Sequence, residues 1–89
     1  MYRILFTARS LSSLKRLPVR IKNKAGTLID ALVIDYRDSR LRTKKLRTRQ
    51  ELYSFRISRE YRCIFEFTDS STIKILDVRH RKDIYRRVK

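Results

Sequence analysis

The side chains best suited to chemistry gather just after the last predicted strand. The chain's only histidine, His80, lies among Arg79, Arg81 and Lys82, and Tyr85 follows them. An imidazole can take or give a proton near neutral pH, and arginines stabilise phosphate charge. Loops after strands often carry such groups. A lone histidine is more often structural, however, and Tyr85 could equally anchor a terminal helix in the core, so the cluster alone is weak support for catalysis.

A second set of charged side chains lies on two predicted strands, residues 52–58 and 61–68. Alternation places Arg56, Arg62 and Glu66 on one face of these strands. The opposite face carries Tyr53, Phe55, Ile57, Tyr61, Cys63, Phe65 and Phe67. If this aromatic face packs under helices, the three charged side chains lie on the open face of the sheet. On the pattern alone the plainer interpretation is favoured, an ordinary solvated face, because antiparallel sheets commonly have one.

Residues 37–49 form a strongly basic connector before the first of these strands. Together with the cations around His80, this connector is the expected nucleic-acid-binding surface. The residues assigned to that surface are Arg42, Lys44, Lys45, Arg47, Arg49, Arg79 and Lys82. Arginine suits the role because its planar guanidinium can bind two phosphate oxygens at once.

The overall charge favours a polyanionic partner. Lys and Arg number 24 against 9 Asp and Glu, which gives a formal net charge of +15 at pH 7. Such a charge attracts phosphate polymers and makes their binding strongly salt-dependent. From composition alone, a ribosomal or other structural RNA-binding protein is the leading interpretation.

The cysteine and histidine counts exclude several classes of site. A single cysteine, Cys63, allows no intramolecular disulfide, and one Cys with one His cannot supply the four ligands of a Cys/His zinc site. We therefore expect no metal site and no cofactor. The apolar run within residues 2–7 is too short for a signal peptide or a membrane span, so we expect a cytoplasmic protein.

The elements that must position these residues are predicted from hydrophobic periodicity. Residues 2–7 favour a strand, residues 10–17 a short helix, and Pro18 the start of a second helix. The second helix has an apolar stripe formed by Ile21, Ala25, Leu28, Ile29, Leu32 and Tyr36. Strands at 52–58, 61–68 and 73–78 follow, and residues 83–89 favour a last basic helical turn. The order β-α-α-β-β-β-α predicts a small α+β domain over residues 1–89, with an N-terminal helix pair packed on a mainly antiparallel four-stranded sheet.

Three segments resemble one protein family. Residues 52–65, which contain the pair Tyr61-Arg62, resemble the paired central strands of the RelE/ParE superfamily of bacterial toxins. Residues 75–86, with their His-Arg-x-x-x-Tyr pattern, resemble the last strand and tail of those toxins, and the segment around Pro18 fits their second helix. The resemblance implies a toxin of a type II toxin-antitoxin system in a prokaryotic cytoplasm, held inactive by a cognate antitoxin.

The resemblance implies two different activities. RelE-like members cut messenger RNA, usually on the ribosome, and so inhibit translation and arrest growth. ParE-like members poison DNA gyrase instead. Among the residues of this chain, Arg62 and Arg81 match the family's phosphate-stabilising positions, and Tyr85 matches a tyrosine that stacks on or orients a base.

The general base is the open point of this resemblance. The strand that carries catalytic lysines in RelE reads Ser54 and Arg56 here, and neither side chain can act as a base at ordinary pH. His80 is the best replacement, and Glu66 is a second candidate if it faces Arg62. The candidate catalytic set is therefore Arg56, Arg62, Glu66, His80, Arg81 and Tyr85.

The favoured prediction is a metal-independent endoribonuclease that acts on messenger RNA at the ribosome. The alternatives are a gyrase inhibitor without nuclease activity, a non-catalytic basic RNA-binding protein, and a decayed toxin that still binds its antitoxin. If the chain is such a toxin, we expect the antitoxin to present an acidic or amphipathic segment to the basic surface.

Overall fold

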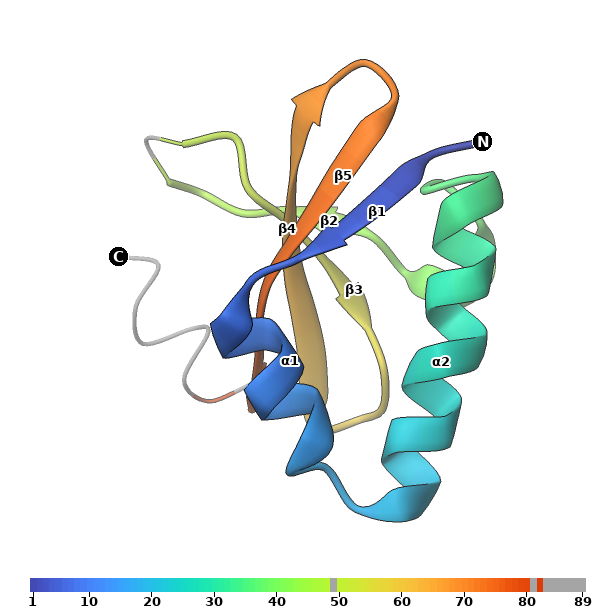
Figure 1. Ribbon diagram of the computed structural model, residues 1–89, viewed down its shortest axis with the longest axis vertical. Coiled ribbons are helices and arrows are strands. Elements are labelled where there is room, and N and C mark those ends of the chain that lie inside the picture. Colours follow the sequence, from blue (N-terminus) through green and yellow to red (C-terminus); the bar gives the residue numbers. More distant parts are fainter. Residues whose placement is uncertain (49, 81, 83–89) are drawn as a thin grey trace.

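Five strands form one sheet in the computed structural model, which describes residues 1–48, 50–80 and 82 (Figure 1). In spatial order they are β1 (Arg3–Phe6), β5 (Thr72–His80), β4 (Tyr61–Asp69), β3 (Tyr53–Arg56) and β2 (Lys44–Lys45). β1 runs parallel to β5, and the other neighbouring strands are antiparallel. The predicted α+β fold with a mainly antiparallel sheet is confirmed.

The sheet has one strand more than expected because part of the basic connector joins it. Lys44 and Lys45 pair with Ser54 and Tyr53 on β3. Just before them lies a short 3-10 helix, η1 (Ser39–Leu41), whose Leu41 is fully buried. A strand of two residues is too short to show alternation, so periodicity could not reveal it.

The first helix, α1 (Ala8–Lys15), begins two residues before the expected start at Ser10. Thr7 sets this start because its hydroxyl oxygen accepts a hydrogen bond from the Ser10 amide at 3.0 Å, which is ordinary N-terminal capping. The same hydroxyl donates to the Leu76 carbonyl oxygen at 2.8 Å. Thr7 therefore ties the start of α1 to β5 at the point where β1 ends, and α1 lies beside the last part of β5 (Figure 1).

The second helix, α2 (Val19–Ile34), follows Pro18 as predicted and supplies one wall of the core. Its buried residues, Ala25, Leu28, Ala31 and Leu32, lie in one cluster with the aromatic face of the sheet. Phe55 and Phe65 on that face are fully buried. The helical stripe and the alternating strands thus pack against each other, and the opposite face of the sheet is left for charged side chains.

The strand boundaries differ from the expected ones in a way that matters for the site. β4 and β5 each have nine residues, and β5 continues through Arg79 and His80. The pairing of β4 with β5 shifts register between Ile64 and Phe65. The expected helical turn at 83–89 lies outside the described residues. None of the described helices combines the length and the apolar character needed to cross a bilayer.

Candidate nucleic-acid interface

Three arginines stand in a row across the sheet. Arg56 on β3 is directly opposite Arg62 on β4, and Arg62 is directly opposite Arg79 on β5. Directly opposite residues of antiparallel strands share a face, and neighbouring strands are about 4.8 Å apart. The three side chains, called the arginine row below, therefore line up over roughly 10 Å on the face opposite the aromatic core.

Arg62, the centre of the row, is only 7% exposed. Its Nε donates to Ser54 Oγ at 2.9 Å, and its Nη2 donates to the carbonyl oxygens of Arg42 at 2.8 Å and Ser54 at 3.3 Å. The residue lies on the predicted face, but it is buried by the chain around Arg42 instead of standing in solvent. Its guanidinium is thus fixed in place before any ligand binds.

Arg79, at one end of the row, is held by an acid that the sequence analysis did not single out. Arg79 Nε donates to Asp77 Oδ2 at 2.7 Å, with side-chain exposures of 16% and 12%. Asp77 Oδ1 accepts from the hydroxyl of Ser13 on α1 at 2.9 Å and from the Val78 amide at 2.8 Å. In the sequence, the position of Asp77 within an otherwise apolar strand, just before the basic residues 79–82, could have indicated this role.

His80 lies beside Tyr61, its partner in the β4–β5 pairing, with the two rings 5.6 Å apart at 76°. His80 Nδ1 accepts a hydrogen bond from the Lys82 amide at 3.3 Å, so the proton of the neutral ring lies on Nε2. Nε2 is 3.8 Å from a carboxylate oxygen of Glu60. Alternation directs the ring away from the face of the arginine row, so His80 stands at the end of the row instead of above it.

A pocket of about 500 Å³ brings this end of β5 together with α1. It is lined by Arg9, Ser12, Ser13, Arg16, Asp77, Val78, Arg79 and His80 and is called the α1 pocket below. The α1 residues recur at spacings of three and four, which places them on one face of the helix. They were not predicted, because hydrophobic periodicity identifies the apolar face of a helix and not its polar face, although their spacing of three and four was a usable signal.

The comparisons with known proteins agree with this geometry. The model of the ParE toxin of the type II toxin-antitoxin system parDE matches residues 4–85. The chain belongs to the ParE toxin family. The resemblance to RelE/ParE-type toxins inferred from residues 52–65 and 75–86 is therefore confirmed. No curated protein sequence matches the chain.

Several solved structures share the fold of this ParE-family chain. The RelBE2 toxin-antitoxin complex from Mycobacterium tuberculosis is similar at 30% identity and a TM-score of 0.64, covering 90% of this chain and 98% of that one. A RelB-RelE antitoxin-toxin complex from Methanococcus jannaschii is 26% identical, with a TM-score of 0.74 over 92% of this chain and 95% of that one. A YoeB/ParE toxin from Agrobacterium tumefaciens is 18% identical, with a TM-score of 0.75 over 88% and 96%.

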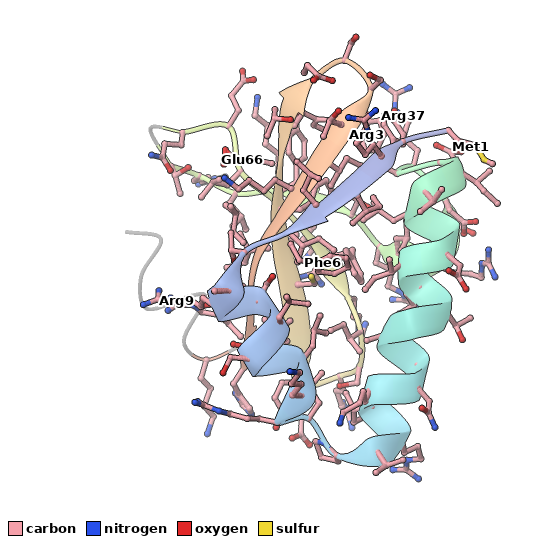
Figure 2. The ribbon with its side chains drawn as sticks, in the orientation of Figure 1. Met1, Arg3, Phe6, Arg9, Arg37 and Glu66 are labelled. Carbon is pink, nitrogen blue, oxygen red and sulfur yellow. The ribbon has the colours of Figure 1, made fainter. Side chains whose placement is uncertain are left out.

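The structure of this ParE-family chain separates Glu66 from Arg56, Arg62 and His80, the candidate catalytic residues that it describes besides Glu66. Glu66 pairs with Lys74 on β5 and lies four residues beyond Arg62, about 13 Å along β4. Figure 2 shows Glu66 well apart from Arg9 of the α1 pocket. Glu66 shares a face with Arg62, as predicted, but it does not contact the arginine row.

The structure of the ParE-family chain describes all the predicted nucleic-acid-binding residues except Arg49. Lys44 and Lys45 lie on the outer strand β2, while Arg42, Arg47 and Lys82 are exposed. The remaining predicted residues, Arg49, Arg81 and Tyr85, lie outside the described residues. In the sheet, β2 of the basic connector is separated from β5 by β3 and β4, the strands that carry Arg56 and Arg62.

Proposed function

We propose that this ParE-family chain is a toxin that cleaves messenger RNA without a metal ion. The observation that carries the proposal is the arginine row, which ends beside His80 and the α1 pocket. The row is suited to a phosphodiester backbone, because the partly exposed Arg56 and Arg79 can each bind phosphate oxygens through a planar fork, while the buried Arg62 between them adds positive charge. An imidazole at the end of such a row adds a group that can transfer protons.

Cleavage of the phosphodiester bond needs a base, an acid and positive charge close to the phosphate. The 2′-hydroxyl loses its proton as its oxygen attacks the phosphorus, and the bond to the 5′-oxygen breaks as that oxygen is protonated. The products are a cyclic phosphate and a 5′-hydroxyl end. Arg79, which lines the α1 pocket together with His80 and is held by Asp77, stabilises the extra charge on the phosphate, the buried Arg62 adds positive charge to the row, and His80 exchanges the protons.

The proposed partner in the prokaryotic cytoplasm is a cognate antitoxin. Two of the similar structures are toxin-antitoxin complexes, from Mycobacterium tuberculosis and Methanococcus jannaschii. The net charge of +15 supports a partner segment of opposite charge. Binding of an acidic segment over the arginine row would exclude RNA from the same surface.

The deciding experiment is a cell-free translation reaction with the purified protein, followed by mapping of the 5′ ends of the messenger. New 5′-hydroxyl ends within the translated region are expected, and they should be lost with His80→Gln. Arg3→Ala is the matched control, because it removes an exposed cation at the start of β1, far from Arg9 and the α1 pocket (Figure 2). Intact messenger with normal protein synthesis contradicts the proposal.

Inhibition of DNA gyrase is the second candidate function, favoured by the match to the ParE toxin model. A gyrase poison needs no proton transfer, so His80→Gln should leave its toxicity unchanged. A supercoiling assay with purified gyrase distinguishes the two activities. Neither a passive RNA-binding protein nor a decayed toxin would arrest growth on expression.

A further inference from the structure

A second cationic pocket lies at the other end of the arginine row. It has a volume of about 240 Å³ and is called the α2 pocket below. It is lined by Lys24 on α2, Arg40 and Arg42 in and after η1, and Arg56, Ile57, Ser58 and Arg59 at the end of β3. Five basic side chains from three parts of the chain therefore surround one small space.

Most of this positive charge is not neutralised by the protein. Arg40 forms two hydrogen bonds with the carboxylate of Asp38, from Nε at 3.1 Å and from Nη2 at 2.9 Å. Among the described residues, no acidic side chain lies within ion-pair distance of the other four lining cations, Lys24, Arg42, Arg56 and Arg59. Like charges this close repel one another, so an anion in the pocket would be stabilised.

The walls of the α2 pocket are held in place by the sheet. Arg42 has a left-handed backbone with φ of 47°, and its carbonyl oxygen accepts the 2.8 Å bond from Arg62. Arg56 Nε donates to the Ser58 carbonyl oxygen at 3.4 Å. The pocket thus shares Arg56 with the arginine row and is braced by Arg62, so the pocket and the row adjoin at Arg56.

We propose that the α2 pocket is a phosphate-binding subsite for single-stranded RNA, which holds the backbone of nucleotides beyond those on the arginine row. This inference rests on the proposed function, because it takes RNA to be the strand that follows the row. Guanidinium forks match phosphate oxygens, and no aromatic ring lines the described pocket for a base to stack on. The subsite therefore contributes affinity without sequence preference.

The test measures RNA binding without cleavage. His80→Gln is the background for all proteins, and fluorescence anisotropy gives affinities for single-stranded RNA of increasing length at several salt concentrations. The pocket variant is Lys24→Ala with Arg59→Ala, both exposed cations. The matched control is Lys22→Ala with Arg3→Ala, which removes the same charge from exposed positions that do not line the pocket.

The pocket variant should bind long RNA roughly tenfold more weakly than the control, and its salt slope should fall by about 1.4, because single strands contribute about 0.7 per phosphate contact. A mononucleotide should bind both variants equally. Equal affinities and equal salt slopes of the pocket variant and the control for long RNA would overturn the proposed subsite. The proposal is also overturned if the pocket binds an acidic peptide that RNA cannot displace.

The same data separate this inference from the proposed function. Loss of RNA affinity in the pocket variant, together with a wild-type protein that cuts no messenger, retains the subsite and rejects the nuclease. Normal cutting, with no difference between the pocket variant and the control, rejects the subsite and retains the nuclease.

Discussion

Arg62 on β4 donates from Nη2 to the backbone carbonyl oxygen of Arg42, which lies twenty residues earlier in the chain, at 2.8 Å. Arg42 is the only non-glycine residue with positive φ among those the structure describes. A left-handed backbone costs roughly 1–2 kcal/mol in a residue with a side chain, so this turn needs support from its surroundings. The buried guanidinium supplies that support and also forms the centre of the arginine row.

Arg62→Ala is expected to weaken both folding and cleavage. Its removal leaves the buried Ser54 carbonyl oxygen and the partly buried Arg42 carbonyl oxygen without this donor, which should lower the free energy of unfolding by about 1–3 kcal/mol. Messenger cleavage should fall roughly a hundredfold or more, because the central cation of the row is lost. Urea unfolding measures the first effect, and cleavage is assayed at a temperature where the variant is folded. An unchanged unfolding midpoint would contradict the bracing role.

His80→Gln is expected to reduce cleavage roughly a hundredfold or more while leaving stability almost unchanged. Glutamine can still form hydrogen bonds at this position, but its amide does not take up or release a proton near neutral pH. Single-turnover cleavage of a short RNA on ribosomes measures the loss, with Arg3→Ala as the control. Full activity in His80→Gln would exclude His80 as the acid or base.

Asp77→Asn is expected to loosen the attachment of α1 to the sheet. Its carboxylate accepts bonds from Arg79, Ser13 and the Val78 amide at a position that is largely shielded from water. Replacing the charged acceptor should lower the free energy of unfolding by about 1–3 kcal/mol. The control is Asp30→Asn, an exposed acid on α2, and equal urea midpoints for the two variants would refute the assignment.

The Asp38–Arg40 pair predicts a specific pH dependence. The side-chain hydrogen bonds from Arg40, with the Arg40 amide, lower the pKa of Asp38 to about 2. A lowered pKa means that the pair adds stability above the ordinary carboxyl value near pH 4, and that this stability is lost as the pH falls toward 2. The difference in Tm between the wild type and Asp38→Asn should therefore be constant from neutral pH to about pH 5 and should disappear near pH 2. A difference that persists unchanged at pH 2 would rule out the pair as its source.

Cys63 is expected to be chemically silent in the folded protein. It is fully buried in the core, and burial raises the pKa of its thiol far above the ordinary value. The reactive thiolate is therefore scarce and inaccessible at pH 8. A colorimetric thiol reagent should label the protein only in denaturant, and rapid labelling under native conditions would show that this part of the core opens readily.

Local patterns in the sequence determined the core and the faces of the sheet. The stripe on α2 and the alternation of Phe55, Cys63 and Phe65 follow from the periods of helices and strands, which any short segment carries by itself. The excess of basic residues likewise predicted a polyanionic partner, because the net charge follows from the amino-acid composition alone. These features made the α+β fold and the cationic surface predictable.

Register and long-range contacts were decided only by the tertiary structure. Alternation along each strand predicts which face of the sheet Arg56 and Arg62 occupy. It does not predict which residue of β5 pairs with Arg62, because the pairing of β4 with β5 depends on the register shift between Ile64 and Phe65. The α1 pocket depends on Thr7 binding the Leu76 carbonyl, a contact between residues 69 positions apart. The α2 pocket depends on the bond from Arg62 to Arg42. Such contacts depend on how distant segments pack together, so no local period in the chain encodes them.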